Sequence, residues 1–168
     1  MSLRKSQELK MSKVYKSVLE LVGNTPIIQL QNCVPQNGHR FFGKVEYFNP
    51  GGSVKDRIAI SILEEAERAG QLKPGGTVVE ATSGNTGVGL AMVAALKGYK
   101  CVFVMPDKIS EEKRAMLRAY GARVVITPTG VEPDDPRSHY EVARKFVEIT
   151  PGSFYTNQYH NPQNAKKH

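Results

Sequence analysis

The chain has 168 residues, of which 40% are hydrophobic and 23% are charged, as expected of a globular protein that can bury well over half of its unfolded surface. Its net charge is +7, but the basic residues are scattered and mostly lie beside acidic ones, so we expect no nucleic-acid partner. The longest apolar stretch, around residues 88–96, is far shorter than the roughly 20 residues that span a bilayer, so we expect no membrane association.

The first fifty residues show few regular elements. Residues 1–13 are polar and include a second methionine, and we expect them to be a tag or a disordered extension. They do not resemble a signal peptide. The pattern then predicts a short helix at 14–21, a turn at 23–26, a strand at 27–30, a loop at 31–39 and a strand at 40–46.

From residue 54 onward, apolar strands alternate with helical patterns. The predicted order is a helix from 54 that ends near 72–76, a strand at 77–80, a helix at 86–98, a strand at 101–105, a helix at 110–120, a strand at 123–127, a loop at 128–136, a helix at 137–149 and a strand at 154–156. Ser110 is expected to cap its helix by accepting a hydrogen bond from the N–H of Lys113. The alternation predicts an α/β fold with a parallel sheet and helices on both faces, in which ligands bind at the strand ends.

Cysteine and histidine give no sign of a metal site or a disulfide framework. The two cysteines, Cys33 and Cys101, are too few for either, and Cys101 lies in an apolar run where we expect a buried thiol. The four histidines show no ligand spacing. We therefore expect a reduced, cytoplasmic protein without a metal ion.

Two short motifs carry most of the chemical information. Lys55 follows a glycine pair at the predicted start of a helix, and residues 82–87 form a Thr-Ser-Gly-Asn-Thr-Gly turn at the start of another. An amine attacks a carbonyl only in its deprotonated form, and the exposed N–H groups and hydroxyls of such a turn bind anions. Together they suit chemistry on an amino acid with a carbonyl cofactor on the lysine. Taken singly, they read as an exposed lysine, with Asp56 and Arg57 beside it as a surface ion pair, and as a helix-capping turn.

At these motifs the chain resembles the cysteine synthase and cystathionine β-synthase family of pyridoxal-phosphate enzymes. The matching stretches occur in the family's order and spacing, at residues 21–26, 49–57, 80–87, 105–106 and 157–159. The resemblance implies the tryptophan synthase β-like fold, a parallel three-layer αβα sheet. It also implies pyridoxal phosphate as cofactor, β-replacement on serine or O-acetylserine in cysteine or cystathionine biosynthesis, a small amino-acid substrate, and a homodimer for the full-length family.

The resemblance also implies roles for individual residues. The lysine that matches Lys55 carries pyridoxal phosphate and moves the proton at the substrate's Cα. The residue that matches Asn85 hydrogen-bonds the ring hydroxyl of the cofactor as well as the substrate. The substrate-binding set around the α-carboxylate is Thr82, Ser83, Asn85, Thr86 and Gln158.

The family's later half, including the loop that holds the cofactor phosphate, would follow residue 168. On this comparison residues 14–50 begin the larger domain, 51–156 form the small α/β domain, and 157–168 start the return to the larger one. We expect the fold to be incomplete and the chain as given to be an inactive fragment that holds pyridoxal phosphate poorly. The apolar strands at 27–30 and 40–46 are then expected to be exposed, mobile, or covered by another copy of the chain.

Within the family, the second substrate is open between sulfide and homocysteine. Tyr159 looks more like the cystathionine β-synthases, whereas many cysteine synthases carry phenylalanine there. The animal synthases bind haem through an N-terminal cysteine and histidine, but neither residue type precedes Cys33 here, so we expect no haem.

Two alternatives from other classes remain open. Gly84, Gly87 and Gly89 also read as G-x-x-G-x-G, with Asp107 twenty residues after Gly87, which favours a nucleotide-binding βαβ unit. The glycine order is reversed from the usual fingerprint, and this interpretation leaves Lys55 without a role. The other alternative is a truncated, non-catalytic module.

Overall fold

A computed structural model of the chain describes residues 13–82 and 84–167. Ser83 and nearly all of the predicted N-terminal extension therefore lie outside the described residues. The main sheet is parallel, with the strand order β5-β4-β3-β6. Its strands are β3 (Thr77–Ala81), β4 (Lys100–Pro106), β5 (Arg123–Thr127) and β6 (Ser153–Tyr155). The predicted parallel α/β sheet is confirmed.

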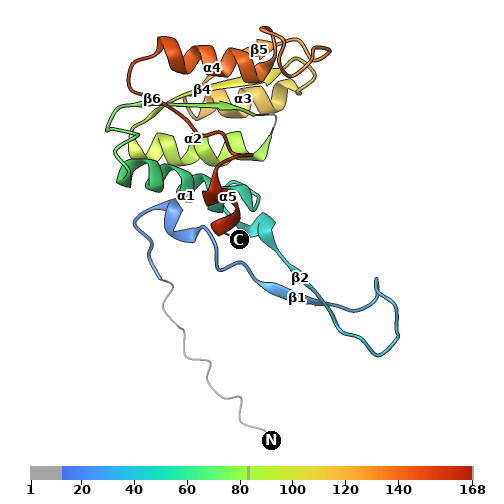
Figure 1. Ribbon diagram of the computed structural model, residues 1–168. Helices are drawn as coiled ribbons and strands as arrows, with labels where there is room; N and C mark the ends of the chain where they lie inside the picture. The colour runs from blue at the N-terminus through green and yellow to red at the C-terminus, as the bar shows by residue number, and fades with distance from the viewer. Residues whose placement is uncertain (1–12, 83, 168) are drawn as a thin grey trace, which may run out of the picture.

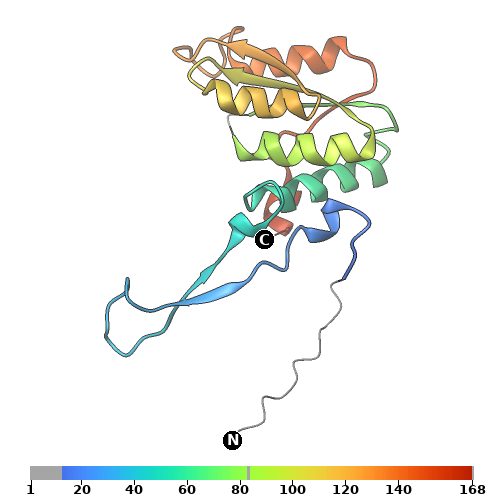
Figure 2. The same cartoon turned by 180° about the vertical axis from the view of Figure 1, so that it is seen from behind.

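Helices cover both faces of this sheet (Figures 1 and 2). They are α1 (Lys55–Arg68), α2 (Asn85–Lys97), α3 (Glu111–Ala119) and α4 (His139–Ile149). Helix α4 lies on one face and α2 and α3 lie on the other, while α1 packs on the outer side of α2. We call this layered unit, from α1 to β6, the body.

The core of the body divides into two apolar clusters, one on each face of the sheet. Phe103 of β4 is fully buried on the side of α2, and Val104, the next residue, is fully buried on the side of α4, because successive side chains of a strand point to opposite faces. All five residues of β3 are buried. A strand buried on both faces is mostly apolar, which is why the sequence pattern located β3 and β4 well.

The contact between α1 and α2 depends on a glycine. A Cβ atom on Gly89 of α2 would lie 3.0 Å from the carbonyl oxygen of Lys55 and 3.1 Å from the Cβ of Ala59. Gly87 is also closely packed, since its Cβ would lie 2.8 Å from the methyl group of Thr82. Packing therefore accounts for two glycines of the G-x-x-G-x-G pattern without a nucleotide.

The N-terminal segment forms a separate projection. Strands β1 (Ile27–Leu30) and β2 (Phe41–Lys44) pair antiparallel as a two-stranded hairpin, which extends away from the body (Figure 1). We call residues 27–44 the arm. Ile27 is 63% exposed and Phe42 is 56% exposed. The expectation that these apolar strands are exposed is confirmed.

Some local predictions need correction. The N-terminal helix is a short 3₁₀ turn, η1 (Val18–Leu21), and the second arm strand gives way to another, η2 (Glu46–Phe48). The capping bond predicted for Ser110 is wrong: the residue occupies the N-cap of α3 without a side-chain capping bond. A short helix that the sequence did not indicate, α5 (Pro162–Lys166), follows β6 and contacts α1.

Two further observations concern the described part of the chain. None of its helices is long and apolar enough to cross a membrane. Residues 13–82 and 84–167 also contain no cluster of three or more metal-ligating side chains. The buried position predicted for Cys101 is confirmed, and burial raises the pKa of its thiol to about 12.

Candidate functional site

Lys55 is the first residue of α1, and a tight turn places it there. The N–H of Gly52 donates to the carbonyl of Asn49 at 2.8 Å, and Gly52 has a φ of +78°, a conformation that glycine adopts without strain. The hydroxyl of Ser53 then accepts a hydrogen bond from the N–H of Lys55 at 3.1 Å. The Gly-Gly-Ser segment thus turns the chain into the helix and satisfies one of its free N–H groups.

Asp56 stabilises the same turn through a hydrogen bond to its backbone. Its side chain is fully buried, and Oδ2 accepts a hydrogen bond from the N–H of Gly51 at 2.5 Å. Oδ1 has no hydrogen-bond partner among the described residues, and burial raises the pKa of the carboxyl. A Cβ atom on Gly51 would lie 2.4 Å from Oδ1, so only glycine fits there. Asp56 therefore stabilises the turn, and the alternative in which it forms a surface ion pair with Arg57 is wrong.

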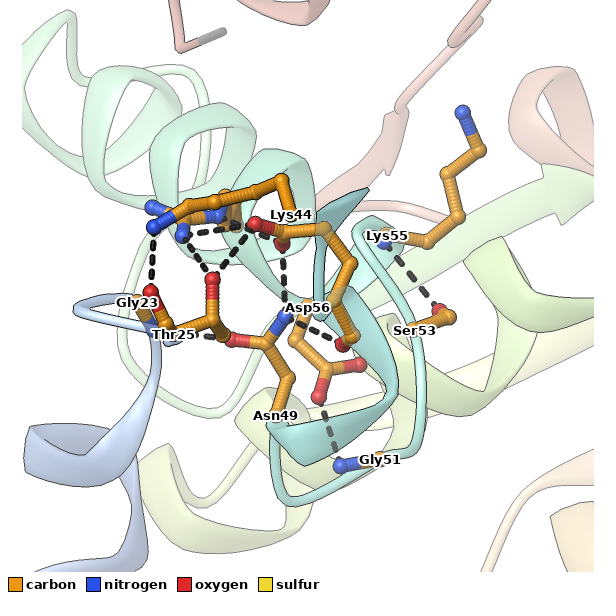
Figure 3. A network of polar contacts seen from close by, with 10 residues as sticks. Gly23, Thr25, Lys44, Asn49, Gly51, Ser53, Lys55 and Asp56 are labelled. Carbon is orange, nitrogen blue, oxygen red and sulfur yellow. Dashed lines mark hydrogen bonds and ion pairs between the residues drawn. The ribbon is translucent and has the colours of Figure 1, made fainter. Parts of the chain in front are cut away.

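Arg57 instead pairs with Glu46 in a network that fastens the arm to the body (Figure 3). The guanidinium is bidentate to the carboxylate, at 2.8 and 2.9 Å, and the Thr25 hydroxyl and the Asn49 amide also donate to Glu46. The hydrogen bond from Arg57 is the main reason why the pKa of Glu46 falls to about 2. We call these four residues the joint. The side chain of Lys55 points away from the joint, which leaves its amine available for other chemistry.

The turn at residues 82–87 connects β3 to α2. Thr82 is buried and continues the pairing with β4 through its N–H, which donates to the carbonyl of Val104 at 3.1 Å. The N–H groups of Asn85 and Thr86 donate to none of the described residues, and they stand at the positive end of the α2 dipole. This is the arrangement by which helix N-termini bind anions. The Asn85 side chain is exposed and that of Thr86 is buried.

Gln158 reaches this turn from the far end of the described chain. Its side chain is buried, and its Oε1 accepts a hydrogen bond from the Thr86 hydroxyl at 2.5 Å. Helix α5 fixes the backbone of Gln158, because the Asn164 amide donates to its carbonyl at 3.1 Å. Two predicted carboxylate-binding residues, 72 positions apart in the sequence, are thus brought into direct contact.

The described site residues fit a carbonyl cofactor and an amino-acid substrate. Close packing at Gly89 brings the backbone of Lys55 against α2, one turn after its start. An amine and a candidate anion site, whose N–H groups donate to none of the described residues, therefore occupy adjacent helix N-termini. Ser83, the remaining predicted ligand, lies outside the described residues.

The sequence analysis missed two residues beneath this site. Glu80 of β3 and Thr156, just after β6, are both buried, and the Thr156 hydroxyl donates a hydrogen bond to the Glu80 carboxyl. Burial raises the pKa of Glu80 to about 7. The signal was present in the sequence: a glutamate inside an otherwise apolar strand is rarely buried without a specific partner.

The fold and the candidate site together define a parallel α/β protein whose predicted ligand-binding residues lie at the carboxyl ends of the strands. A family model described as pyridoxal-phosphate dependent enzyme matches residues 18–168, and the chain belongs to this family. Pyridoxal phosphate is thus the cofactor of the family. The resemblance drawn from the motifs is confirmed.

Individual relatives show which members the chain is similar to. It is 47% identical over 161 residues to a cystathionine β-synthase of Mus musculus, covering 95% of this chain and 29% of that protein. It is 46% identical over 156 residues to a cysteine synthase of Staphylococcus aureus, covering 93% of this chain and 49% of that protein. Among solved structures, it resembles a hydrogen sulfide-producing enzyme from Fusobacterium nucleatum with a TM-score of 0.84 and 39% identity, covering 94% of this chain and 50% of the other. The chain thus spans half the length of these relatives or less.

Proposed function

We propose that this chain provides the substrate-binding part of a pyridoxal-phosphate enzyme that performs β-replacement on serine or O-acetylserine, in cysteine or cystathionine biosynthesis. The observation that carries the proposal is the hydrogen bond between Thr86 and Gln158. It joins the turn at the start of α2 to the 157–159 motif, beside the helix that begins at Lys55. Relatives of both enzyme types match the chain about equally well, so the proposal includes both sulfide and homocysteine as the second substrate.

The anion site would hold the α-carboxylate of the amino acid. Thr86 donates to the Oε1 end of the Gln158 amide, so the Nε2 end is the one that can donate to a ligand. The N–H groups of Asn85 and Thr86, which donate to none of the described residues, add two donors at the helix start. In this proposal Thr82 and Ser83 complete the set, and Asn85 also hydrogen-bonds the cofactor's ring hydroxyl.

Lys55 would be the base at the reacting carbon. When bound, pyridoxal phosphate withdraws electrons from the substrate's Cα and makes its proton acidic. Lys55 would bind the aldehyde of the cofactor until the amino group of the substrate displaces it, and its released amine would then take the Cα proton and return it. A carboxylate fixed by Gln158 and the α2 N-terminus orients the Cα–H bond toward that amine.

The first test is labelling rather than turnover. We expect excess pyridoxal phosphate to give the purified chain a visible absorbance band, and borohydride reduction followed by peptide mass mapping to place the adduct on Lys55. Lys55→Ala should abolish both signals. Lys113→Ala, which removes an exposed lysine of α3, is the matched control and should keep them. Labelling spread evenly over many lysines would contradict the role of Lys55.

The second test separates substrate from cofactor. Addition of L-serine should perturb the absorbance band, and Gln158→Ala should weaken this response while leaving the adduct on Lys55. Asn85→Ala should disturb the orientation of the cofactor more than its retention. In a fusion to the C-terminal half of a homologous synthase, Lys55→Ala should abolish turnover of serine with homocysteine or of O-acetylserine with sulfide. Wild-type turnover in that variant would refute the proposal.

A further inference from the structure

Glu80 is a buried carboxyl that the proposed reaction does not use. It is the fourth residue of β3 and only 1% exposed. None of the ion pairs among residues 13–82 and 84–167 includes it. A buried carboxylate without a cation is costly unless hydrogen bonds compensate. The groups around the Glu80 carboxyl therefore indicate its role in the fold.

The groups that favour the charged form of the Glu80 carboxyl come from the segment that follows β6. The Thr156 hydroxyl donates to Oε2, and the Thr156 N–H extends the sheet by donating to the carbonyl of Val79 at 3.1 Å. The N–H groups of Asn157 and Gln158 also face the carboxyl and favour its charged form. Asn157 has a φ of 43°, and a left-handed residue of this kind directs successive N–H groups to one side, as in an anion-binding nest. The carboxylate is thus the internal anion around which residues 156–158 turn.

The same carboxyl lies close to the predicted substrate-binding side chain. The Gln158 side chain is near enough to favour the charged form of Glu80, which lowers the pKa of that carboxyl, while its Oε1 accepts from Thr86. An amide with its nitrogen toward a carboxylate and its oxygen toward a hydroxyl has one allowed orientation. A second Nε2 proton remains for a ligand.

We propose that Glu80 is the positioning residue for Gln158. Its carboxylate holds the turn of residues 156–158 at the end of β3 and thereby orients the Gln158 amide against Thr86. This inference rests on the proposed function for its consequence, the binding of the amino-acid carboxylate. When Glu80 takes up a proton, it loses acceptor capacity for the N–H groups of the turn, and the turn loosens. Substrate binding would then weaken as the pH falls through the titration of Glu80.

The electrostatic surroundings support a titration near neutral pH. Burial raises the pKa of Glu80 to about 7, against the lowering effect of its hydrogen bonds. The titratable groups that face it are Tyr140 of α4 and Tyr155 of β6, and burial raises the pKa of both phenols, so both are neutral there. Arg144 and Glu141 of α4 pair with each other beside Tyr155. Thr86 of α2, which donates to Gln158 at this end, is neutral.

The test follows the turn itself by NMR. In the ¹⁵N-labelled chain, the backbone amides of Asn157 and Gln158 and the side-chain amide of Gln158 should show one common transition near neutral pH. Glu80→Gln should abolish it. Glu64→Gln, an exposed glutamate on α1, and His160→Gln, an exposed histidine just beyond the turn, should keep it.

A second pair of variants distinguishes positioning from a general structural role. Thr156→Val removes the hydroxyl donor to the carboxylate and should move the transition to higher pH, because the charged form loses a hydrogen bond. Thr156→Ser retains the donor and should restore the original midpoint. On the alkaline side, we expect the Gln158 amide to exchange about tenfold more slowly than in Glu80→Gln, the effect of one hydrogen bond to a charged group. A transition that persists in Glu80→Gln, or that does not move in Thr156→Val, would overturn the inference.

Titration with L-serine in the presence of pyridoxal phosphate then separates the two proposals. If both hold, serine shifts the Thr86 and Gln158 signals and binds about tenfold more tightly above the transition than below it, and this pH dependence disappears in Glu80→Gln. If serine shifts neither signal at any pH, the proposed function fails, while the pH titration still decides the role of Glu80. If serine binds with the same pH dependence in Glu80→Gln, the inference about Glu80 fails and the proposed function stands.

Discussion

The body and the arm use the same kinds of residue with opposite outcomes. Phe103 in β4 is fully buried, whereas Phe42 in β2 is 56% exposed, and Ile58 in α1 is fully buried, whereas Ile27 in β1 is 63% exposed. The difference is in the layers: β4 has a strand on each side and a helix layer on each face, while β1 and β2 have only each other. A side chain's contribution to stability therefore comes from the layers around it and cannot be read from its hydrophobicity alone.

The joint between these regions is polar. The Arg57–Glu46 pair, with Thr25 and Asn49, connects the base of the arm to α1. The candidate site lies on the body's side of that connection, because Lys55 starts the same helix but points away from the joint.

The largest expected effect contrasts two phenylalanines. Phe103→Ala should destabilise the chain by about 3–5 kcal/mol, because it leaves a cavity between β4 and the helices on its face. Phe42→Ala should change the free energy of unfolding by less than about 1 kcal/mol, because its ring already contacts solvent. Urea denaturation of both variants measures the difference. Equal losses would mean that the arm contributes to the folded core as much as the body does.

Next in size is a pH effect on the body. The folded-state pKa of Glu80 is raised from 4.5 to about 7, so between these values the folded chain holds a proton that the unfolded chain has lost. The contribution of Glu80 to the free energy of unfolding should therefore fall by roughly 3 kcal/mol in total as the pH rises from 4.5 through 7. In Glu80→Gln this part of the pH dependence should disappear. Identical pH profiles of the unfolding free energy in the two proteins would contradict the raised pKa.

A smaller effect tests the close packing behind Lys55. Gly89→Ala should cost about 1–3 kcal/mol, because the new Cβ would press on the Lys55 carbonyl and on Ala59. Gly130→Ala is the matched control, since its Cβ would meet nothing within 4 Å, and its effect should be small. Thermal unfolding measures both. Similar shifts in the two variants would show that α1 and α2 can separate without cost.

The smallest effect concerns the joint. The pKa of Glu46 is lowered from 4.5 to about 2, mainly by the hydrogen bond from Arg57. The contribution of this pair to the free energy of unfolding is therefore complete above pH 4.5 and is lost as the pH falls through about 2. We expect that contribution to be about 1 kcal/mol or less, since the pair is partly exposed. NMR titration of the Glu46 carboxyl should give the low midpoint, and Arg57→Gln should return it toward 4.5. A normal midpoint in the unaltered chain would mean that the arm is fastened by other contacts.

The sequence located the body better than the arm, for identifiable reasons. The strand predicted at 123–127 coincides with β5, and the strand predicted at 77–80 falls one residue short of β3, because apolar β-branched runs bounded by turns are local signals. The expected helix at 14–21 is a 3₁₀ turn, and α5 was not expected. A helix of five residues carries too little periodicity to detect, and α5 depends on its contact with α1.

What the amino-acid sequence determined by itself is local and chemical. It placed Lys55 at a helix start, residues 82–87 at the end of a strand and Gln158 in a motif of its own, because turn residues, helix starts and periodicity are encoded over a few neighbouring positions. Only the tertiary structure decided which groups meet: Arg57 with Glu46, Gly89 with Lys55, Thr86 with Gln158, and Thr156 with Glu80. These contacts join residues between 11 and 76 positions apart. They form because parallel pairing sets the carboxyl ends of β3 and β6 side by side and because α1 packs on α2, which no pattern within a single element specifies.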